Sequence, residues 1–483
     1  MKAILLFTLG LTAYSAAQTF NDFLARVNSA PDSLKMSIVD SLMNTAPAFP
    51  YLEQDTLAHY LFRGNASTIT VPGDANQWNP SAFPMTLISG TNLWYRTGIF
   101  EPDARLDYKF VLNGSNWILD PLNPWQVSGG YGPNSELRMP QYIPAPEIQY
   151  YNNISHGALT DTSFYSTNLG NSRTISVYLP PSFFYTSDSF PVMLFHDGLE
   201  YISLANSRNI FDYLIAQERI VPTVGVFIPP VNRIEEYAGS LQNQFSQFIV
   251  YEVMPWVDRK FRTRRDPAYR ATLGASNGGN IALWLGLNYP LTFGRVAAQS
   301  SNVQSSISSG FQNGPLLDTQ FYLDFGTYDI PMLITLVDDF VQILQIRGYL
   351  YQYRIYHEGH SWGNWRAHVD NALEMFFPGN SLAIDKPLEM ASQFNLSPNY
   401  PNPFNSSTTI HFELYQAAEI KMAVYDIQGR LIRLLAQGRE KPGNHFIRWD
   451  GMNNNLYSVS SGIYLLVLDV GNYRVSRKMI FLQ

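Results

Sequence analysis

The stretch 271–280, ATLGASNGGN, decides how the largest part of this chain is interpreted, because it places a serine between two pairs of small residues. It follows a run typical of a buried strand, YRATL, and precedes a run typical of a helix, NIALWLGL. Gly274 and Gly278 lie two positions on either side of Ser276 and carry no side chains that would clash in a tight turn. An ordinary glycine-rich loop is the alternative. The strand, turn and helix together favour a nucleophile elbow, with Ser276 as the nucleophile.

A serine nucleophile requires a histidine to accept its proton and a carboxylate to orient that histidine. In this type of domain the chain order is serine, acid, histidine. His360 lies in HEGHSWGNW, directly after the strand-like run YQYRIY, where a loop can bring the imidazole over the edge of a sheet. His357 is still at the end of that run and His368 falls in the next predicted helix. His360 is therefore the expected base.

The acid is expected after the preceding strand. Asp329 directly follows the run QFYLDFGTY, and Asp324, inside the run, is the alternative. Asp329 also suits a structural role, because a helix is predicted to begin near Pro331 and aspartate often caps helix starts. The order of Ser276, Asp329 and His360 along the chain favours the catalytic interpretation.

An oxyanion hole requires two N–H donors directed at the developing negative charge. The N–H of Asn277, directly after the nucleophile, is the first expected donor. The second is expected in the loop after the strand-like run PVMLFHDG, from Gly198 or Leu199, and the sequence does not choose between them. His196 precedes the serine, against the expected order, and is expected to shape this loop.

Residues 150–378 alternate strand-like and helix-like runs, which predicts a mostly parallel sheet with helices on both faces. The strand-like runs are SRTISVYLP, FPVMLFHDG, TVGVFIPP, RATLGAS, GRVAAQS, TQFYLDFG and YLYQYRIYHEG. The helix-like runs are SQFIVYEVMPWVDRKF, NIALWLGLNYP and PMLITLVDDFVQILQIRG.

On several motifs this region resembles the enterochelin-esterase-like group of α/β-hydrolases, which includes feruloyl and acetyl-xylan esterases. The matching segments are FHDG at 195–198, Asn232-Arg233, Met254-Pro255-Trp256-Val257, GASNGG, Phe293-Gly294-Arg295-Val296 and Gly359-His360 with Trp362 and Trp365. The resemblance implies hydrolysis of a carboxylic ester through an acyl-enzyme. Arg233, Trp362 and Trp365 are the candidate substrate-binding residues, and the two tryptophans equally suit packing beneath the His360 loop.

The N-terminal part divides into a helical segment, 18–50, and a strand-rich segment, 51–145. At VPGDANQWNP and YKFVLNGSNWILDPLNP the second segment resembles the immunoglobulin-like module of glycogen-branching enzymes and of enterochelin-type esterases. Carbohydrate-binding modules of this type stack aromatic rings on sugars. Four tryptophans either do so here or fill the core and the seam between domains: Trp78, Trp94, Trp117 and Trp125.

Residues 379–397 are interpreted as a linker, and residues 398–483 as a compact β-sandwich of alternating strands. This last segment resembles the C-terminal sorting domain of the type IX secretion system. The matching residues are Asn399-Tyr400-Pro401-Asn402-Pro403-Phe404-Asn405, Val424-Tyr425-Asp426, Gly429-Arg430, Trp449-Asp450-Gly451, Ser461-Gly462-Ile463-Tyr464 and Lys478-Met479. The resemblance implies that the type IX machinery handles the chain. A purely structural sandwich is the alternative.

The first 17 residues, MKAILLFTLGLTAYSAA, have the charged, apolar and small-residue order of a secretory signal peptide, with a buried helix as the alternative. The chain has 483 residues, no cysteine and a formal net charge of -7. No basic tract suggests nucleic-acid binding, and no later segment is apolar enough to predict a membrane span. Neither a metal-binding pattern nor a cofactor motif is present, so no metal and no cofactor are expected.

The expected architecture is an α/β-hydrolase flanked by two small β-sandwiches. The expected function is a secreted serine esterase acting on acetylated or feruloylated polysaccharide or oligosaccharide. A siderophore trilactone esterase and a non-catalytic carbohydrate-binding surface protein with a vestigial hydrolase domain are the alternatives. A protease or an acyltransferase could use the same fold, and only the family resemblance favours an esterase over these activities.

Overall fold

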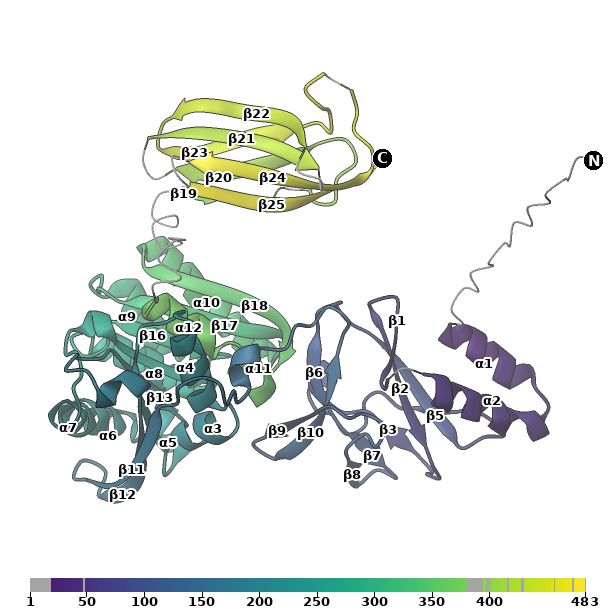
Figure 1. Ribbon diagram of the computed structural model, residues 1–483, viewed down its shortest axis with the longest axis horizontal. Helices are drawn as coiled ribbons and strands as arrows, with labels where there is room; N and C mark the ends of the chain where they lie inside the picture. Colours follow the sequence, from purple (N-terminus) through teal and green to yellow (C-terminus); the bar gives the residue numbers. More distant parts are fainter. Residues whose placement is uncertain are drawn as a thin grey trace, which may run out of the picture. The chain divides into compact units, whose positions relative to one another are not determined.

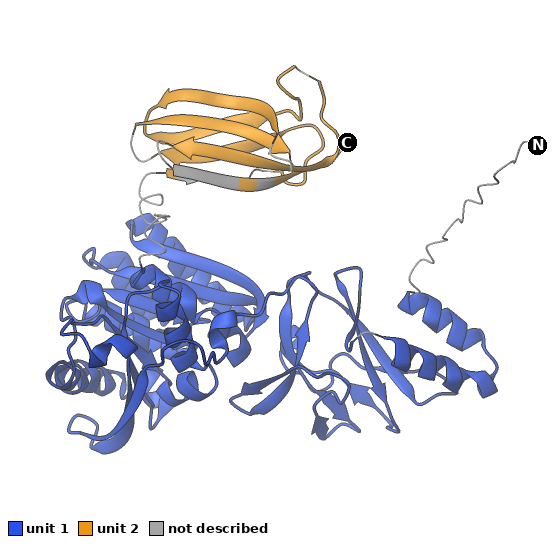
Figure 2. Ribbon diagram, viewed as in Figure 1, with its two compact units in different colours: residues 1–381 blue, residues 382–483 orange. Residues whose placement is uncertain are grey.

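The computed structural model describes residues 19–46, 48–379, 394–396, 399, 401–414, 417–426, 430–455, 457–470 and 473–482. The chain divides into two compact units, Met1–Ser381 and Leu382–Gln483 (Figure 2). The predicted signal peptide, residues 1–17, and most of the predicted linker lie outside the described residues.

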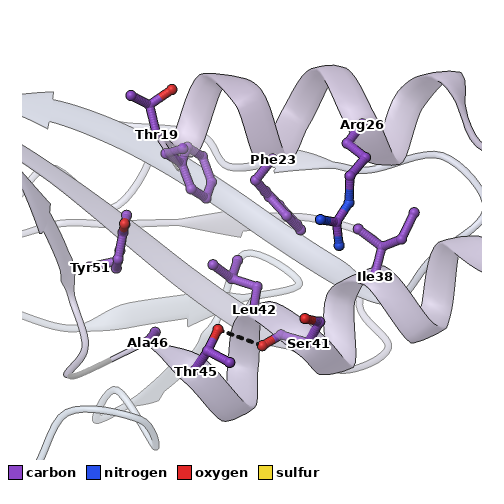
Figure 3. A pocket seen from close by; sticks show the side chains of 10 residues that line it. Thr19, Phe23, Arg26, Ile38, Ser41, Leu42, Thr45, Ala46 and Tyr51 are labelled. Atoms are coloured by element: carbon purple, nitrogen blue, oxygen red, sulfur yellow. Dashed lines mark hydrogen bonds between the residues drawn. The ribbon is translucent and has the colours of Figure 1, made fainter. Parts of the chain in front are cut away.

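Two helices open the first unit, α1 (Phe20–Ser29) and α2 (Asp32–Thr45). Thr19 begins α1 with a capping box, in which its hydroxyl accepts from the N–H of Asp22 and the Asp22 carboxylate accepts from the N–H of Thr19. The predicted helical segment is interrupted before Pro31, because proline disfavours a helical conformation in the residue that precedes it. A pocket lined by apolar side chains such as Phe23 and Leu42 and by polar ones such as Arg26 lies between these helices and Tyr51 (Figure 3). None of the candidate catalytic residues lines it.

Three small sheets follow, with the strand orders β1-β2-β5-β4, β6-β10-β9 and β3-β7-β8. Their strands are β1 (Tyr51–Glu53), β2 (Leu57–Arg63), β3 (Ile69–Thr70), β4 (Thr86–Leu87), β5 (Leu93–Ile99), β6 (Arg105–Tyr108), β7 (Phe110–Leu112), β8 (Asn116–Ile118), β9 (Gln126–Gly129) and β10 (Gly132–Arg138). We call residues 51–145 the N-terminal β-module. Trp94 is buried in its core, whereas Trp117 and Trp125 are about half exposed, so the four tryptophans do not share one environment.

An eight-stranded sheet with surrounding helices forms the part of the unit that follows the β-module (Figure 1), in the order β11-β12-β14-β13-β15-β16-β17-β18. The six strands from β14 to β18 run parallel, and β12 pairs antiparallel with both β11 and β14, which confirms the expected mostly parallel sheet. The strands are β11 (Ala158–Ser166), β12 (Asn171–Leu179), β13 (Val192–His196), β14 (Val224–Ile228), β15 (Arg270–Ala275), β16 (Arg295–Gln299), β17 (Gln320–Tyr328) and β18 (Leu350–Gly359).

Both faces of this sheet are covered. Along β13, Met193 and Phe195 enter one apolar cluster while Val192 and Leu194 enter another, as expected when successive side chains point to opposite faces. The covering helices are α3 (Gly198–Ser203), α4 (Ser207–Ala216), α5 (Arg233–Ala238), α6 (Gln242–Gln247), α7 (Met254–Lys260), α8 (Asn277–Asn288), α9 (Ser305–Asn313), α10 (Pro331–Arg347), α11 (Trp362–Ala367) and α12 (Val369–Phe376).

The second unit contains two sheets, ordered β19-β20-β23 and β22-β21-β24-β25. Its strands are β19 (Phe394–Leu396), β20 (Thr408–Leu414), β21 (Ala418–Asp426), β22 (Leu431–Glu440), β23 (Gly443–Trp449), β24 (Gly462–Val470) and β25 (Tyr473–Phe481). β19 lies inside the predicted linker, 379–397, and pairs with β20. Residues 394–396 therefore belong to the C-terminal sandwich and not to a linker. Trp449 is fully buried in the centre of the core.

Candidate active site

Ser276 lies on a strained turn between β15 and α8. Its backbone angles are φ 57° and ψ −122°, a left-handed region that residues with side chains rarely adopt. A Cβ on Gly274 would lie 2.3 Å from the carbonyl carbon and oxygen of Gly278. A Cβ on Gly279 would lie 2.7 Å from the Ser301 hydroxyl. The glycines therefore permit the close approach that the motif predicts.

His360 and Asp329 form a close pair at the ends of neighbouring parallel strands. Nδ1 of His360 is 2.7 Å from Oδ1 of Asp329. The Asp329 side chain is fully buried, whereas 22% of the His360 side chain is exposed. Asp329 immediately precedes Ile330, the N-cap residue of α10, so it does not itself occupy the cap position that the structural alternative required.

Asp324 has a different environment. It lies fully buried within β17, and its Oδ2 accepts a hydrogen bond from Nε2 of Gln299 at 3.1 Å. Burial raises the pKa of Asp324 to about 6. The Asp324 carboxylate thus contacts Gln299 from within β17, whereas Asp329, directly after the strand, contacts His360.

The loop after β16 connects the serine turn to the histidine loop. The N–H of Ser276 donates to the carbonyl of Gln299 at 2.8 Å. One residue further on, the Ser300 hydroxyl accepts from Nε1 of Trp365 at 3.0 Å, and Trp365 lies edge-on to His360 with ring centroids 5.0 Å apart. The three candidate catalytic residues therefore follow β15, β17 and β18 at the same edge of the sheet.

Two helix starts face this edge. Asn277 is the first residue of α8 and Gly198 is the first residue of α3. N–H groups in the first turn of a helix have no acceptor within the helix, and the helix dipole makes this end favourable for negative charge. β13 and β15 are adjacent parallel strands, so both predicted donors follow neighbouring strand ends. A Cβ on Gly198 would lie 2.4 Å from the backbone of Ile228, which explains the glycine.

Arg233 binds the loop that is predicted to supply the second oxyanion donor. Its Nε and Nη2 each lie 2.7 Å from an oxygen of the Asp197 carboxylate, and Nη2 also donates to the carbonyl of Ala275 at 3.2 Å. Arg233 thus joins the loop before Gly198 to the end of the serine strand. Asp197 stands in the FHDG motif, but no local sequence pattern links it to Arg233, 36 residues away.

The two tryptophans after His360 differ in exposure. Trp365 is buried, with only 7% of its surface exposed, whereas Trp362 is half-buried and packs edge-on against Tyr201. The packing interpretation therefore suits Trp365. Gly130, in the N-terminal β-module, faces the indole nitrogen of Trp362, since a Cβ there would lie 3.9 Å from it.

The other histidines of the unit are engaged elsewhere. His196 is fully buried and contacts the Thr272 hydroxyl at 2.9 Å, and burial lowers its pKa to about 3, with a smaller effect of Arg233. His357 contacts Asp103 at 2.6 Å. His368 contacts Glu358 at 2.8 Å; burial alone would lower its pKa, but Glu358 raises it.

The N-terminal β-module touches both loops of the His360–Asp329 pair, which no sequence pattern revealed. Gln77 donates from Nε2 to the carbonyl of Asp329 at 3.3 Å. Arg105 lies 3.3 Å from the Ser361 hydroxyl. These contacts span more than two hundred residues of sequence and appear only in the folded chain.

Within the described residues, the structure contains no group of three or more His, Asp or Glu side chains placed to hold a metal ion. In the same part of the chain, no helix combines the length and the apolar character that crossing a membrane requires.

Comparisons with known proteins match two separate parts of the chain. Residues 166–376 match the family described as "Putative esterase", and residues 399–482 match the secretion system C-terminal sorting domain. The chain is 29% identical over 151 residues to the uncharacterized protein YbbA of Bacillus subtilis, a match covering 28% of this chain and 60% of that protein. It is 27% identical over 168 residues to an endo-1,4-beta-xylanase/feruloyl esterase of Xylanibacter ruminicola, covering 32% of this chain and 23% of the relative.

Among solved structures, the enterobactin esterase of Shigella flexneri shares the fold. It superimposes with a TM-score of 0.58 at 20% identity, over 67% of this chain and 94% of that chain. The similarity extends across more of the chain than the 166–376 family match.

Proposed function

We propose that this chain, whose residues 166–376 form a carboxylic ester hydrolase domain, is an exported serine esterase that works through an acyl-enzyme. The observation that carries the proposal is the 2.7 Å contact between His360 and Asp329, which follow strands of the same sheet as Ser276 on its strained strand-to-helix turn. This combination supplies a nucleophile, a base and an orienting acid.

In the first half of the reaction, Oγ of Ser276 attacks the ester carbonyl carbon while His360 accepts the serine proton. The carbonyl oxygen becomes negatively charged, and the N–H groups of Asn277 and of Gly198 or Leu199 stabilise it at the two helix starts. Asp329 holds the imidazole by Nδ1 and stabilises its positive charge. The tetrahedral intermediate collapses, the C–O bond to the alcohol breaks, and His360 returns its proton to the leaving alcohol.

In the second half, His360 removes a proton from water, which attacks the acyl carbon. Collapse of the second tetrahedral intermediate releases the carboxylic acid and restores the Ser276 hydroxyl. Each step transfers one proton through His360, so the cycle needs no metal or cofactor.

The proposed substrate is an acetylated or feruloylated polysaccharide or oligosaccharide outside the cell. The sorting domain at residues 399–482 indicates export across the outer membrane to the surface or the medium. One relative of the hydrolase domain combines a xylanase with a feruloyl esterase, which supports a carbohydrate-linked ester. The half-buried Trp362 is the side chain we assign to contact the aromatic or sugar part of the ester.

Hydrolysis of p-nitrophenyl acetate by the wild type and by Ser276→Ala tests the activity. We expect kcat to fall by at least ~10³-fold in the variant, the size of triad deletions in serine hydrolases. Equal rates for the two proteins would exclude the proposed nucleophile. Acetylated xylan, feruloylated sugars and a catechol-siderophore lactone, assayed side by side, then distinguish a carbohydrate esterase from a siderophore esterase.

A further inference from the structure

Arg105, in β6 of the N-terminal β-module, is completely buried, which is rare for an arginine and requires charged partners. Its Nε lies 2.5 Å from Glu136 and its Nη2 lies 2.5 Å from Asp107, both in the same module. Burial alone would lower the pKa of Arg105, but Asp107, Glu136 and Glu358 raise it well above its usual value. The guanidinium is therefore a permanent charge held by carboxylates.

The remaining side of this guanidinium faces the hydrolase domain. Nη1 lies 3.3 Å from the Ser361 hydroxyl and 3.6 Å from a carboxylate oxygen of Glu358. A Cβ on Gly363 would lie 2.0 Å from Cζ of Arg105, so the start of α11 lies directly against the guanidinium. Only glycine permits this approach, because any side chain would displace the arginine or the helix.

These contacts lie on both sides of His360 in the sequence. Ser361 follows it directly, and Gly359, which precedes it, packs against Asp74, since a Cβ there would lie 2.1 Å from the Asp74 carboxyl carbon. Oδ2 of Asp74 accepts from the N–H of Asp107 at 2.8 Å, and Asp107 binds Arg105. The backbone that carries the imidazole is thus held before and after His360 by one connected set of buried groups.

We propose that Arg105 is a positioning residue for His360, acting through Ser361, Glu358 and the close packing of Gly363. This inference rests on the proposed function, because it takes His360 as the base that serves Ser276. A catalytic side chain must be held within about 0.5 Å of its working position, and loops do this less well than helices or strands. A planar fork with four buried partners, Asp107, Glu136, Glu358 and Ser361, fixes such a loop, so the N-terminal β-module is part of the catalytic apparatus.

The test compares kcat and KM for p-nitrophenyl acetate in the full-length chain carrying Arg105→Lys or Arg105→Met. Arg105→Lys keeps the charge between Asp107 and Glu136 but lacks the fork that reaches Ser361. We expect Arg105→Lys to lower kcat about tenfold and Arg105→Met about 10²-fold, the scale of a 1 Å displacement, with KM changed less than about threefold. Tm is measured on the same samples, and the assay temperature is set well below it.

Arg138→Met is the matched control. Arg138 pairs with the same Glu136 at 2.8 Å and packs on Trp125 within the β-module, so its loss disturbs the same carboxylate without touching the His360 loop. We expect its kcat to stay within about twofold of wild type, because its partners Glu136 and Trp125 both lie in the β-module and not in the His360 loop.

Arg105→Lys with wild-type kcat overturns the inference, as does a rise in KM at constant kcat in either Arg105 variant. If Arg105→Met fails to fold, Arg105→Lys decides. Ser276→Ala in the same assay keeps the two claims apart. Its inactivity beside a fully active Arg105→Lys removes only the positioning role, whereas full activity of Ser276→Ala removes the proposed function.

Discussion

Oδ1 of Asp329 lies 2.7 Å from Nδ1 of His360 and also accepts the N–H of Ile330 at 2.6 Å. Oδ2 of the same carboxylate is buried and has no hydrogen-bond partner within the described residues. The contact with Oδ1 of Asp329 selects the imidazole tautomer that carries its proton on Nδ1. Nε2 of His360 is then free to accept the proton of Ser276.

Asp329→Asn should therefore lower kcat by about 10³- to 10⁴-fold with little change in KM, because the amide favours the wrong imidazole tautomer. The measurement is the steady-state hydrolysis of p-nitrophenyl acetate. Asp324→Asn is the matched control, since Asp324 is equally buried but hydrogen-bonds Gln299. If only Asp324→Asn lost activity, Asp324 and not Asp329 would be the acid that orients His360.

Gly274→Ala should lower the free energy of unfolding by about 3 kcal/mol or more. The new Cβ would lie 2.3 Å from backbone atoms of Gly278, and backbone cannot move aside as a flexible side chain can. Gly130→Ala is the control, because its Cβ would meet nothing nearer than 3.9 Å. Urea unfolding monitored by circular dichroism measures both. Similar midpoints for the two variants would contradict the tight-turn geometry.

The sequence predicts most of the parallel sheet because its strands are buried on both faces and read as continuous apolar runs, such as PVMLFH in β13. It does not predict β11, ALTDTSFYS, which is an edge strand in which every residue except Ser166 is exposed or partly exposed and which has no clear apolar pattern. The short helices α5, α6 and α11 have only six residues each, too few for a helical period to be recognised.

The candidate triad follows from chain order and from the places where strands end, which are local properties. The partners of these residues are not local. Asp197 as the partner of Arg233 and Arg105 as the partner of Ser361 arise from contacts 36 and 256 residues apart. Spacing and periodicity carry no information over such distances, so these roles had to come from the folded structure.

The free energy of unfolding should decrease at acid pH because the buried His196 must take up a proton on unfolding. Its pKa is about 3 in the folded protein and 6.5 in the unfolded chain, so folding is favoured above pH 6.5 and this contribution is lost as the pH falls toward 3. The loss is about 1.4 kcal/mol per pH unit, or about 2 kcal/mol between pH 6.5 and 5. His196→Gln, which can keep a hydrogen bond to Thr272, removes this titration.

The measurement is the difference in urea unfolding free energy between wild type and His196→Gln across that pH range. The comparison is needed because Asp324 acts in the opposite direction: its pKa is raised to about 6, so its contribution increases as the pH falls. Subtracting the unfolding free energies of the two proteins cancels the contribution of Asp324, which both contain. A difference that does not change with pH would mean that His196 is not buried in its neutral form.

Trp449→Ala should destabilise the C-terminal sandwich and leave the esterase intact. Trp449 is fully buried and packs against Phe404, Tyr464 and Phe481, and every buried member of that core lies between residues 394 and 481. Removing a buried indole costs about 3–5 kcal/mol. We expect the Tm of the C-terminal sandwich to decrease. The Tm of the transition that accompanies loss of p-nitrophenyl acetate hydrolysis should stay unchanged.

A chain that ends after residue 379 is the control for this separation. The apolar clusters around the eight-stranded sheet draw their buried members from residues 148–377, so they lose nothing when the C-terminal unit is removed. We expect the shortened enzyme to keep kcat within about twofold, because no candidate catalytic residue and no partner of one is deleted. A shortened chain that folds but has lost activity would show that the sandwich serves catalysis as well as export.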